Sequence, residues 1–186
     1  MTSGRLYTPW RMKYVASTRQ KVDDCIFCNH WNDHLERDRE NFLVYRGQTM
    51  FVVMNIFPYN TGHLMILPCQ HVATLSEISS DMQLELMTLT TYFTELLNDL
   101  MHPDGFNIGI NIGRAAGAGI DSHLHVHLVP RWSGDNNFMP VIGETRVLPE
   151  ELSATYDRIL KWLHQHPPIV GGKPAVLKEG AGISDP

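Results

Sequence analysis

The sequence of 186 residues lacks three features that would place it in common functional classes. No apolar run approaches the roughly 20 residues that a membrane-spanning helix needs, and the first ten residues lack the apolar core of a signal peptide. Only three cysteines are present, two of them three positions apart, which is not a disulfide framework. Lys and Arg number 15 against 20 Asp and Glu, so the basic excess of a general nucleic-acid binder is missing. We therefore expect a cytoplasmic protein that binds neither nucleic acid nor membrane.

The composition is that of one ordinary domain. The apolar share is 43% and the charged share 19%, which suffices for one well-filled core and argues against a mostly disordered chain. Residues 1–24 show no clear period, and residues 166–186 are rich in Gly and Pro. We expect an irregular N-terminal arm over 1–24, a domain over 25–165, and an extended or disordered tail over 166–186.

Hydrophobic periodicity predicts a mostly antiparallel sheet and two amphipathic helices. Runs typical of strands cover residues 42–46, 50–54, 63–67, 106–110 and 122–129, and the first two are joined by a short turn that indicates a hairpin. Apolar residues three or four apart predict a long helix over 79–101 and a second helix over 149–164. Hairpins separated by a helix are typical of an α+β fold.

Ten histidines are the unusual feature of the composition, and three of them alternate along one predicted strand. His123, His125 and His127 would share one face of that strand, because successive side chains point to opposite faces. Such a row can be a half-exposed strand surface, a three-histidine metal site, or a catalytic row in which one imidazole attacks and its neighbours steer charge.

A Gly-Ala-rich loop over residues 113–119 directly precedes this row. Alone it could be a flexible connector, but open backbone N–H groups in such loops also bind anions. Its place beside three aligned histidines favours phosphate chemistry, with a neutral imidazole attacking phosphorus.

The sequence around these features resembles the histidine-triad superfamily. The resemblance rests on the His-x-His-x-His strand behind its Gly-rich loop and on three further segments in the same order and spacing: Cys25-Ile-Phe-Cys28, residues 60–68 and residues 107–113. It covers roughly residues 8–163. In length, and in the exit sequence over residues 130–135, the chain is similar to the bacterial diadenosine tetraphosphate phosphorylases and hydrolases.

The resemblance implies a nucleotidyl-transferring enzyme that cleaves dinucleoside polyphosphates. His125 would take the α-phosphoryl group as a covalent histidine–AMP intermediate, which inorganic phosphate or water would resolve. The other ring nitrogen of His125 would donate to a backbone carbonyl. His127 would contact non-bridging phosphate oxygens, and His63 would reach the reacting phosphates from a neighbouring strand. Asn55 would hold the ribose hydroxyls, and Asn111 would hydrogen-bond phosphate.

One departure from the family pattern concerns the phosphate donors. Many relatives carry Gly-Gln followed by Ser or Thr shortly before the triad, where this chain has Ala118-Gly119-Ile120. Backbone N–H groups of the loop, including those of Gly117 and Gly119, together with Ser122 or Arg114, would have to compensate. The departure leaves open whether inorganic phosphate or water accepts the AMP group from the intermediate.

Two other functions are compatible with the same residues. One is hydrolysis of nucleoside phosphoramidates or other adenylate esters. The other is a nucleotide-sensing module without useful turnover, which the missing donors near Gly119 motivate.

The Cys25-x-x-Cys28 pair is half of a common zinc site. It can also be a pair of reduced, half-buried thiols without a metal. His30 and His34 are the sequence neighbours that could complete a zinc site, although Cys28 and His30 would form a cramped chelate. The resemblance implies instead a structural zinc held by Cys25, Cys28, His71 and His123, with no organic cofactor. It leaves Cys69 as an ordinary buried thiol and implies a two-fold homodimer with a continuous sheet.

Overall fold

The computed structural model describes residues 25–135, 150–170 and 173–174. The predicted arm over residues 1–24 lies outside the described residues, as do residues 136–149 and most of the predicted tail. Two short strands of that tail are described: β6 (Ile169–Val170) pairs with β7 (Lys173–Pro174) in an antiparallel ladder.

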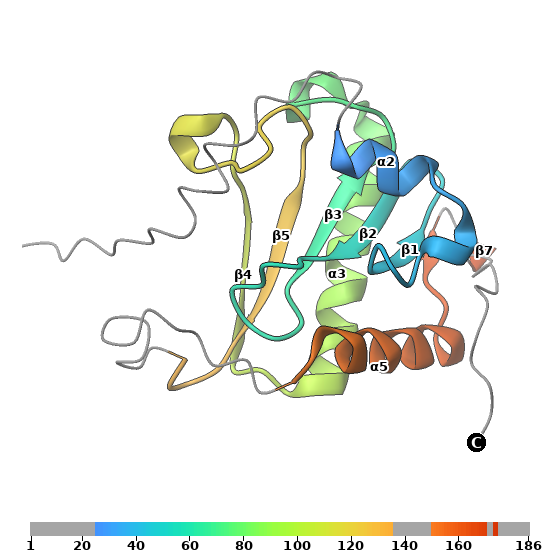
Figure 1. The fold of residues 1–186 in the computed structure, drawn as a ribbon, viewed down its shortest axis with the longest axis vertical. Coiled ribbons are helices and arrows are strands. Elements are labelled where there is room, and N and C mark those ends of the chain that lie inside the picture. The colour runs from blue at the N-terminus through green and yellow to red at the C-terminus, as the bar shows by residue number, and fades with distance from the viewer. Residues whose placement is uncertain (1–24, 136–149, 171–172, 175–186) are drawn as a thin grey trace, which may run out of the picture.

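The centre of the fold is a five-stranded antiparallel sheet with the strand order β1-β2-β3-β5-β4 (Figure 1). Its strands are β1 (Leu43–Arg46), β2 (Met50–Met54), β3 (Leu64–Pro68), β4 (Gly105–Ile110) and β5 (Val126–Arg131). The predicted hairpin is confirmed, because β1 pairs with β2 across a turn in which the Gly47 N–H donates to the Met50 carbonyl at 2.8 Å. A Cβ at Gly47 would lie 2.7 Å from that carbonyl oxygen, so the turn requires glycine.

Among the described residues, three α-helices pack against the sheet: α2 (Ile26–Asn32), α3 (Ser80–Met101) and α5 (Leu152–Gln165). The predicted long helix is confirmed at both ends. The Ser79 side chain accepts from the Met82 N–H at its start, and His102 adopts a left-handed φ of 47° at its end. Single 3-10 turns are η2 (Leu35–Arg37), η3 (Leu75–Glu77) and η4 (Arg114–Ala116).

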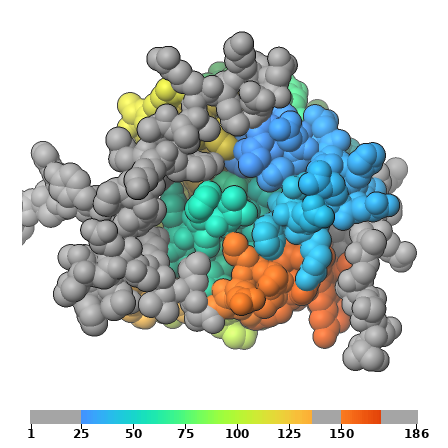
Figure 2. Space-filling model, viewed as in Figure 1, coloured from blue at the N-terminus to red at the C-terminus, as the bar shows by residue number. Residues whose placement is uncertain are grey.

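The two faces of the sheet are covered by different helices, because alternate strand residues point to opposite sides. Val52 and Met54 belong to the main core, which α3 and α5 complete. Phe51 and Val53 belong to a smaller core that the short helix α2 covers. The strands β2 and β3 are therefore buried along their whole length. In Figure 2 the loop that joins these two strands (residues 55–63, teal) reaches the surface between the segment around α2 and α5.

The last strand is displaced from its predicted position. The prediction was a strand over 122–129, but β5 begins at Val126 and extends to Arg131. Its partners explain both ends. Val126 is opposite Ile66 and Ile110, where the pairing with β3 and β4 begins, and Leu124 donates instead to the Val72 carbonyl. At the other end β4 continues to pair as far as Arg131, so the chain stays extended through Pro130.

A partly buried arginine fixes the end of α2 against the sheet. The Arg46 guanidinium pairs with the Asp38 carboxylate at 2.6 Å and donates to the carbonyls of His30 and Trp31 near the C-terminus of the helix. Those carbonyls have no partner inside a helix, so a cation placed there satisfies them and also complements the helix dipole. The side chains of Arg46 and Asp38 are only 15% and 18% exposed.

Within the part of the chain that the structure describes, none of the helices combines the length and the apolar character needed to cross a bilayer. The two-fold dimer stays a prediction, which the molecular mass in solution would test. It is compatible with β4 lying at an edge of the described sheet, and with Ile108 on that strand being 50% exposed.

We expect Arg46→Ala to lower the free energy of unfolding by about 3 kcal/mol, because it leaves the partly buried Asp38 carboxylate and the helix carbonyls without this partner. Urea unfolding followed by circular dichroism measures the change. The matched control is Arg37→Ala, since Arg37 also pairs with carboxylates but its side chain is 55% exposed. Equal unfolding midpoints for the two variants would contradict this role of Arg46.

Candidate active site and metal centre

The three histidines of the row lie on one side of the sheet, as predicted, although two of them precede β5. Leu124, Val126 and Leu128 between and beside them belong to the main core on the opposite side. The rings of His125 and His127 meet edge to face with their centroids 4.8 Å apart. His123 and His125 are 1% and 5% exposed, whereas His127 is partly exposed.

The geometry of His125 selects one tautomer. Its Nδ1 lies 2.8 Å from the carbonyl oxygen of His123, and a carbonyl only accepts, so Nδ1 carries the proton. In the neutral ring Nε2 then holds the lone pair. Burial lowers the pKa of His125, which favours that neutral ring. A buried imidazole with a fixed lone pair has the form that a nucleophile needs.

A second hydrogen-bonded chain fixes His63 and His127. The backbone N–H of Tyr59 donates to Nδ1 of His63 at 3.1 Å, so a neutral His63 carries its proton on Nε2. That Nε2 lies 3.0 Å from Nδ1 of His127 and donates to it. A neutral His127 is thereby held with its own proton on Nε2. The Tyr59 ring packs on both imidazoles, with centroids 4.7 and 5.8 Å away.

The two predicted asparagines flank the row at opposite ends of the sheet. Asn55 directly follows β2, and its amide nitrogen lies 3.4 Å from Nδ1 of His63. Asn111 directly follows β4, whose last residue is opposite Val126 in the register. This register places Asn111 beside the segment that contains His125.

The Gly-Ala-rich loop is more internally bonded than the sequence indicated. The N–H groups of Ala116 and Gly117 donate to the carbonyls of Gly113 and Arg114 within η4. The Arg114 guanidinium pairs with the Asp121 carboxylate at 2.7 Å. A phosphate bound at Gly117 or Arg114 would have to displace these partners.

Gly119 and Ser122 lie in the partly buried bends between the loop and His123. These bends directly precede the histidine row. They are therefore the part of the predicted phosphate-binding segment that is nearest to His125 along the chain.

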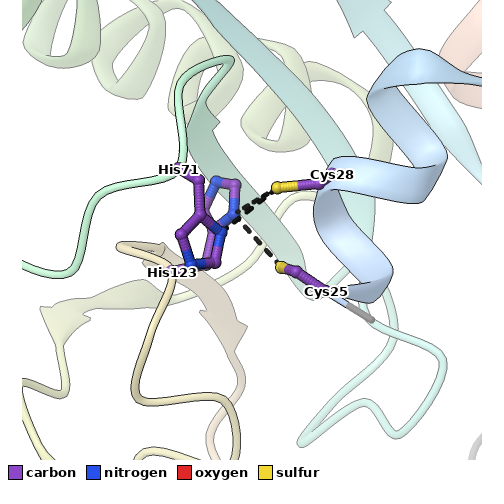
Figure 3. A group of neighbouring side chains, drawn as sticks. All are labelled: Cys25, Cys28, His71 and His123. Carbon is purple, nitrogen blue, oxygen red and sulfur yellow. Dashed lines mark hydrogen bonds between the residues drawn. The ribbon is translucent and has the colours of Figure 1, made fainter. Parts of the chain in front are cut away.

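Cys25, Cys28, His71 and His123 come together as a four-residue cluster positioned to bind a metal (Figure 3). The two cysteines approach from the start of α2, and the histidines from the segments after β3 and before β5. Their ligand atoms all lie within 4.8 Å of one another. His30 and His34, the neighbours considered from sequence, are not members of this cluster.

The separations within the cluster fit a tetrahedral ion. Nδ1 of His123 lies 3.4 Å from Sγ of Cys25 and 3.5 Å from Sγ of Cys28, and Sγ of Cys28 lies 3.2 Å from Nδ1 of His71. Bond lengths of about 2.3 Å to sulfur and 2.0 Å to nitrogen place tetrahedral ligands roughly 3.3–3.8 Å apart.

The protonation chemistry of the cluster also fits a metal. Nε2 of His123 donates to the Pro68 carbonyl at 2.9 Å, so its Nδ1 directs a lone pair at the thiols. Burial lowers the pKa of His123 to about 4 and keeps the imidazole neutral, as a ligand must be. Burial, and then the neighbouring Cys25, raise the pKa of the Cys28 thiol to about 11, so a thiolate there needs a cation to stabilise it.

Two residues of this region were missed by reasoning from sequence. The buried ring of Phe27 lies 5.5 Å from the ring centroids of both His123 and His125. Tyr59 fixes the tautomer of His63. The only sequence signals were the position of Phe27 between the two cysteines and that of Tyr59 in the turn before His63.

The chain is similar to several known proteins. A model of the HIT domain family matches residues 36–134. An AP-4-A phosphorylase of Mycobacterium tuberculosis is 39% identical over 155 residues, which cover 81% of this chain and 80% of that protein. An adenosine 5'-monophosphoramidase of Schizosaccharomyces pombe is 26% identical over 106 residues, 57% of this chain and 76% of that protein.

A solved structure extends the likeness to the fold. The crystal structure of a Zn-bound histidine triad family protein from Mycobacterium smegmatis superposes with a TM-score of 0.61 at 22% identity, covering 78% of this chain and 96% of that one. Its arrangement of strands and helices is the one described above.

We expect the purified protein to contain one metal ion per chain, measured by inductively coupled plasma mass spectrometry after dialysis. Cys28→Ser should abolish binding, because the hydroxyl is a poor replacement for a thiolate ligand. Cys69→Ser is the matched control, since Cys69 is a partly buried thiol outside the cluster. Equal metal contents in the two variants would show that the cluster does not hold the ion.

Proposed function

The chain belongs to the HIT domain family, and on that premise we propose that it is a nucleotidyl-transferring enzyme that cleaves dinucleoside polyphosphates. His125 is its nucleophile, and the product of the first step is a covalent histidine–AMP. The observation that carries the proposal is the hydrogen bond from Nδ1 of His125 to the His123 carbonyl, which leaves the Nε2 lone pair for attack. The AP-4-A phosphorylase at 39% identity supports the choice of substrate.

In the first step Nε2 of His125 attacks the α-phosphorus of the bound dinucleotide. A bond forms between nitrogen and phosphorus, and the bond from phosphorus to the bridging oxygen breaks, with that oxygen keeping the electron pair. The attacking ring becomes positively charged as the new bond forms. The His123 carbonyl, which accepts from Nδ1–H of His125, stabilises that charge. The same hydrogen bond therefore fixes the tautomer and stabilises the transition state.

His127 and His63 assist the attack and are not nucleophiles. His127 presents its Nε2–H to the non-bridging oxygens, because His63 already donates to its other nitrogen. His63 is only 1% exposed and acts near the reacting phosphates mainly by holding His127. Preorganised donors of this kind lower the barrier because they need no reorganisation as charge develops.

The remaining predicted contacts surround this centre. Asn55 holds the ribose hydroxyls, next to His63, and Asn111 binds a phosphate oxygen from the end of β4. Backbone N–H groups at Gly117 and Gly119 and the hydroxyl of Ser122 take the place of the side-chain donors that the loop lacks. Of these, the Gly117 N–H must first leave the Arg114 carbonyl, to which it donates at 2.9 Å.

In the second step an oxygen of inorganic phosphate attacks the phosphorus of the histidine–AMP. The nitrogen–phosphorus bond breaks, the lone pair returns to Nε2, and ADP leaves. Phosphate is preferred to water as the acceptor because the relative at 39% identity is a phosphorylase by name.

Zinc is the metal that best suits the four-residue cluster, since two sulfur and two nitrogen ligands favour a closed tetrahedral site. Bound there, zinc would be structural and would join α2 to the residues before β5. Cys25, Cys28, His71 and His123 would hold it, and no organic cofactor is required.

A second candidate function is hydrolysis of adenosine phosphoramidates, with the same attack by His125 and an amine as the leaving group. The phosphoramidase of Schizosaccharomyces pombe at 26% identity supports it. Its alignment covers less of this chain than that of the phosphorylase, which is why it ranks second.

Product analysis tests the proposal. We expect diadenosine tetraphosphate incubated with the protein and inorganic phosphate to give ADP and ATP, resolved by ion-exchange chromatography, with a protein-free sample as the control. Formation of AMP and ATP with and without phosphate would make water the acceptor. A dinucleotide left intact, with AMP released from adenosine 5'-phosphoramidate, would favour the second candidate, and nucleotide binding without any product would indicate a sensing module.

A further inference from the structure

Phe27 connects the metal cluster to the candidate nucleophile. It lies on α2 between the two cysteine ligands, and its side chain is 6% exposed. Its ring meets His123 edge to face and His125 at a tilt of 50°, with both centroids 5.5 Å away. One aromatic ring therefore packs on a cluster imidazole and on the imidazole proposed to attack.

Most of the contacts that hold the His125 ring come from the metal cluster or from α2. The carbonyl that accepts from its Nδ1 belongs to His123, whose own ring is a cluster member. Phe27 packs against the ring from α2, and His127 meets it at 4.8 Å from β5. Two of these three contacts move if the start of α2 or the His123 backbone moves.

The start of α2 is weakly fixed by the helix itself. The helix has seven residues, too few to be stable alone, and its N-cap residue Cys25 makes no side-chain capping hydrogen bond. Arg46 holds the other end. Cys25 and Cys28 hold this end through sulfur contacts of 3.2–3.5 Å to His71 and His123.

We propose that Phe27 is a positioning residue that transmits the geometry of the metal cluster to His125. An ion shared by the two cysteines and the two histidines fixes the start of α2, which fixes Phe27 against the His125 ring. Metal loading then sets the orientation of the nucleophile without any contact between the metal and the substrate. The inference rests on the proposed role of His125, and it deepens that role by adding regulation through the metal.

The test separates orientation from binding and from folding. In Phe27→Leu we expect the metal content and KM to stay within about twofold, while kcat falls about tenfold or more, because small misplacements of a reacting group are costly. Trp31→Leu is the matched control. It changes an aromatic residue one turn further along α2, whose ring packs on Phe51 at 5.4 Å and on the Arg46 guanidinium at 5.1 Å.

A spectroscopic readout does not depend on turnover. In protein labelled with 15N-histidine, two-dimensional NMR distinguishes a His125 ring with its proton fixed on Nδ1 from one that exchanges between tautomers. We expect the fixed form in the metal-loaded wild type and in Trp31→Leu. We expect the exchanging form in Phe27→Leu and after removal of the metal by a chelator.

Two results would overturn the inference: a wild-type kcat for Phe27→Leu, or a His125 tautomer that neither this substitution nor metal removal changes. If Phe27→Leu fails to fold, Phe27→Met, which is closer in volume, replaces it in both measurements. If the wild-type protein turns over no dinucleotide, the proposed function fails, while the NMR comparison still decides whether Phe27 and the metal orient His125.

Discussion

The hydrogen bond from Nδ1 of His125 to the His123 carbonyl is the interaction on which the account of this site depends. It assigns the lone pair to Nε2, and in the proposed reaction its carbonyl stabilises the positive charge that develops on the ring during attack. It is short-range in sequence, yet it needs His123 and His125 to lie outside the regular ladder of β5. In a paired strand the His123 carbonyl would point toward a neighbouring strand instead of toward the ring of His125.

The fold provides this irregular segment because the pairing of β5 with its two neighbouring strands starts late. Pairing with β3 and β4 begins only at Val126, so the residues before it take other partners. Leu124 bonds to the Val72 carbonyl, and the His123 ring bonds to the Pro68 carbonyl. The metal cluster then anchors the same segment from the side of α2. The proposed catalytic row and the metal cluster thus share His123: its backbone carbonyl holds His125, and its ring belongs to the cluster.

Much of this could be predicted from the sequence because the signals are local. The apolar run of residues 50–54 and the 3.6-residue period in residues 79–101 predicted elements that the structure confirms. The side of the sheet on which the histidines lie followed from strand alternation. The four cluster residues came from the family resemblance, and the structure brings them together.

The rest depends on contacts between segments distant in the chain. The Cys25–His123 contact spans 98 positions, and no local pattern reports it. The same holds for the late start of β5 pairing at Val126, and for the tautomer of His63, which the backbone N–H of a turn residue sets. The loop over residues 113–119 looked open because of its glycines, but glycine composition does not reveal that the N–H groups of Ala116, Gly117 and Ala118 already have acceptors.

The most direct test of the central claim is to trap the covalent intermediate. The protein, mixed with diadenosine tetraphosphate in the absence of inorganic phosphate and quenched within milliseconds, is analysed by mass spectrometry of the intact chain and its peptides. The account predicts one added adenylyl group on His125, its absence in His125→Asn, and its presence in His164→Asn, which removes an exposed histidine of α5. Product formation with no adduct in the wild type, or an adduct that persists in His125→Asn, would contradict it.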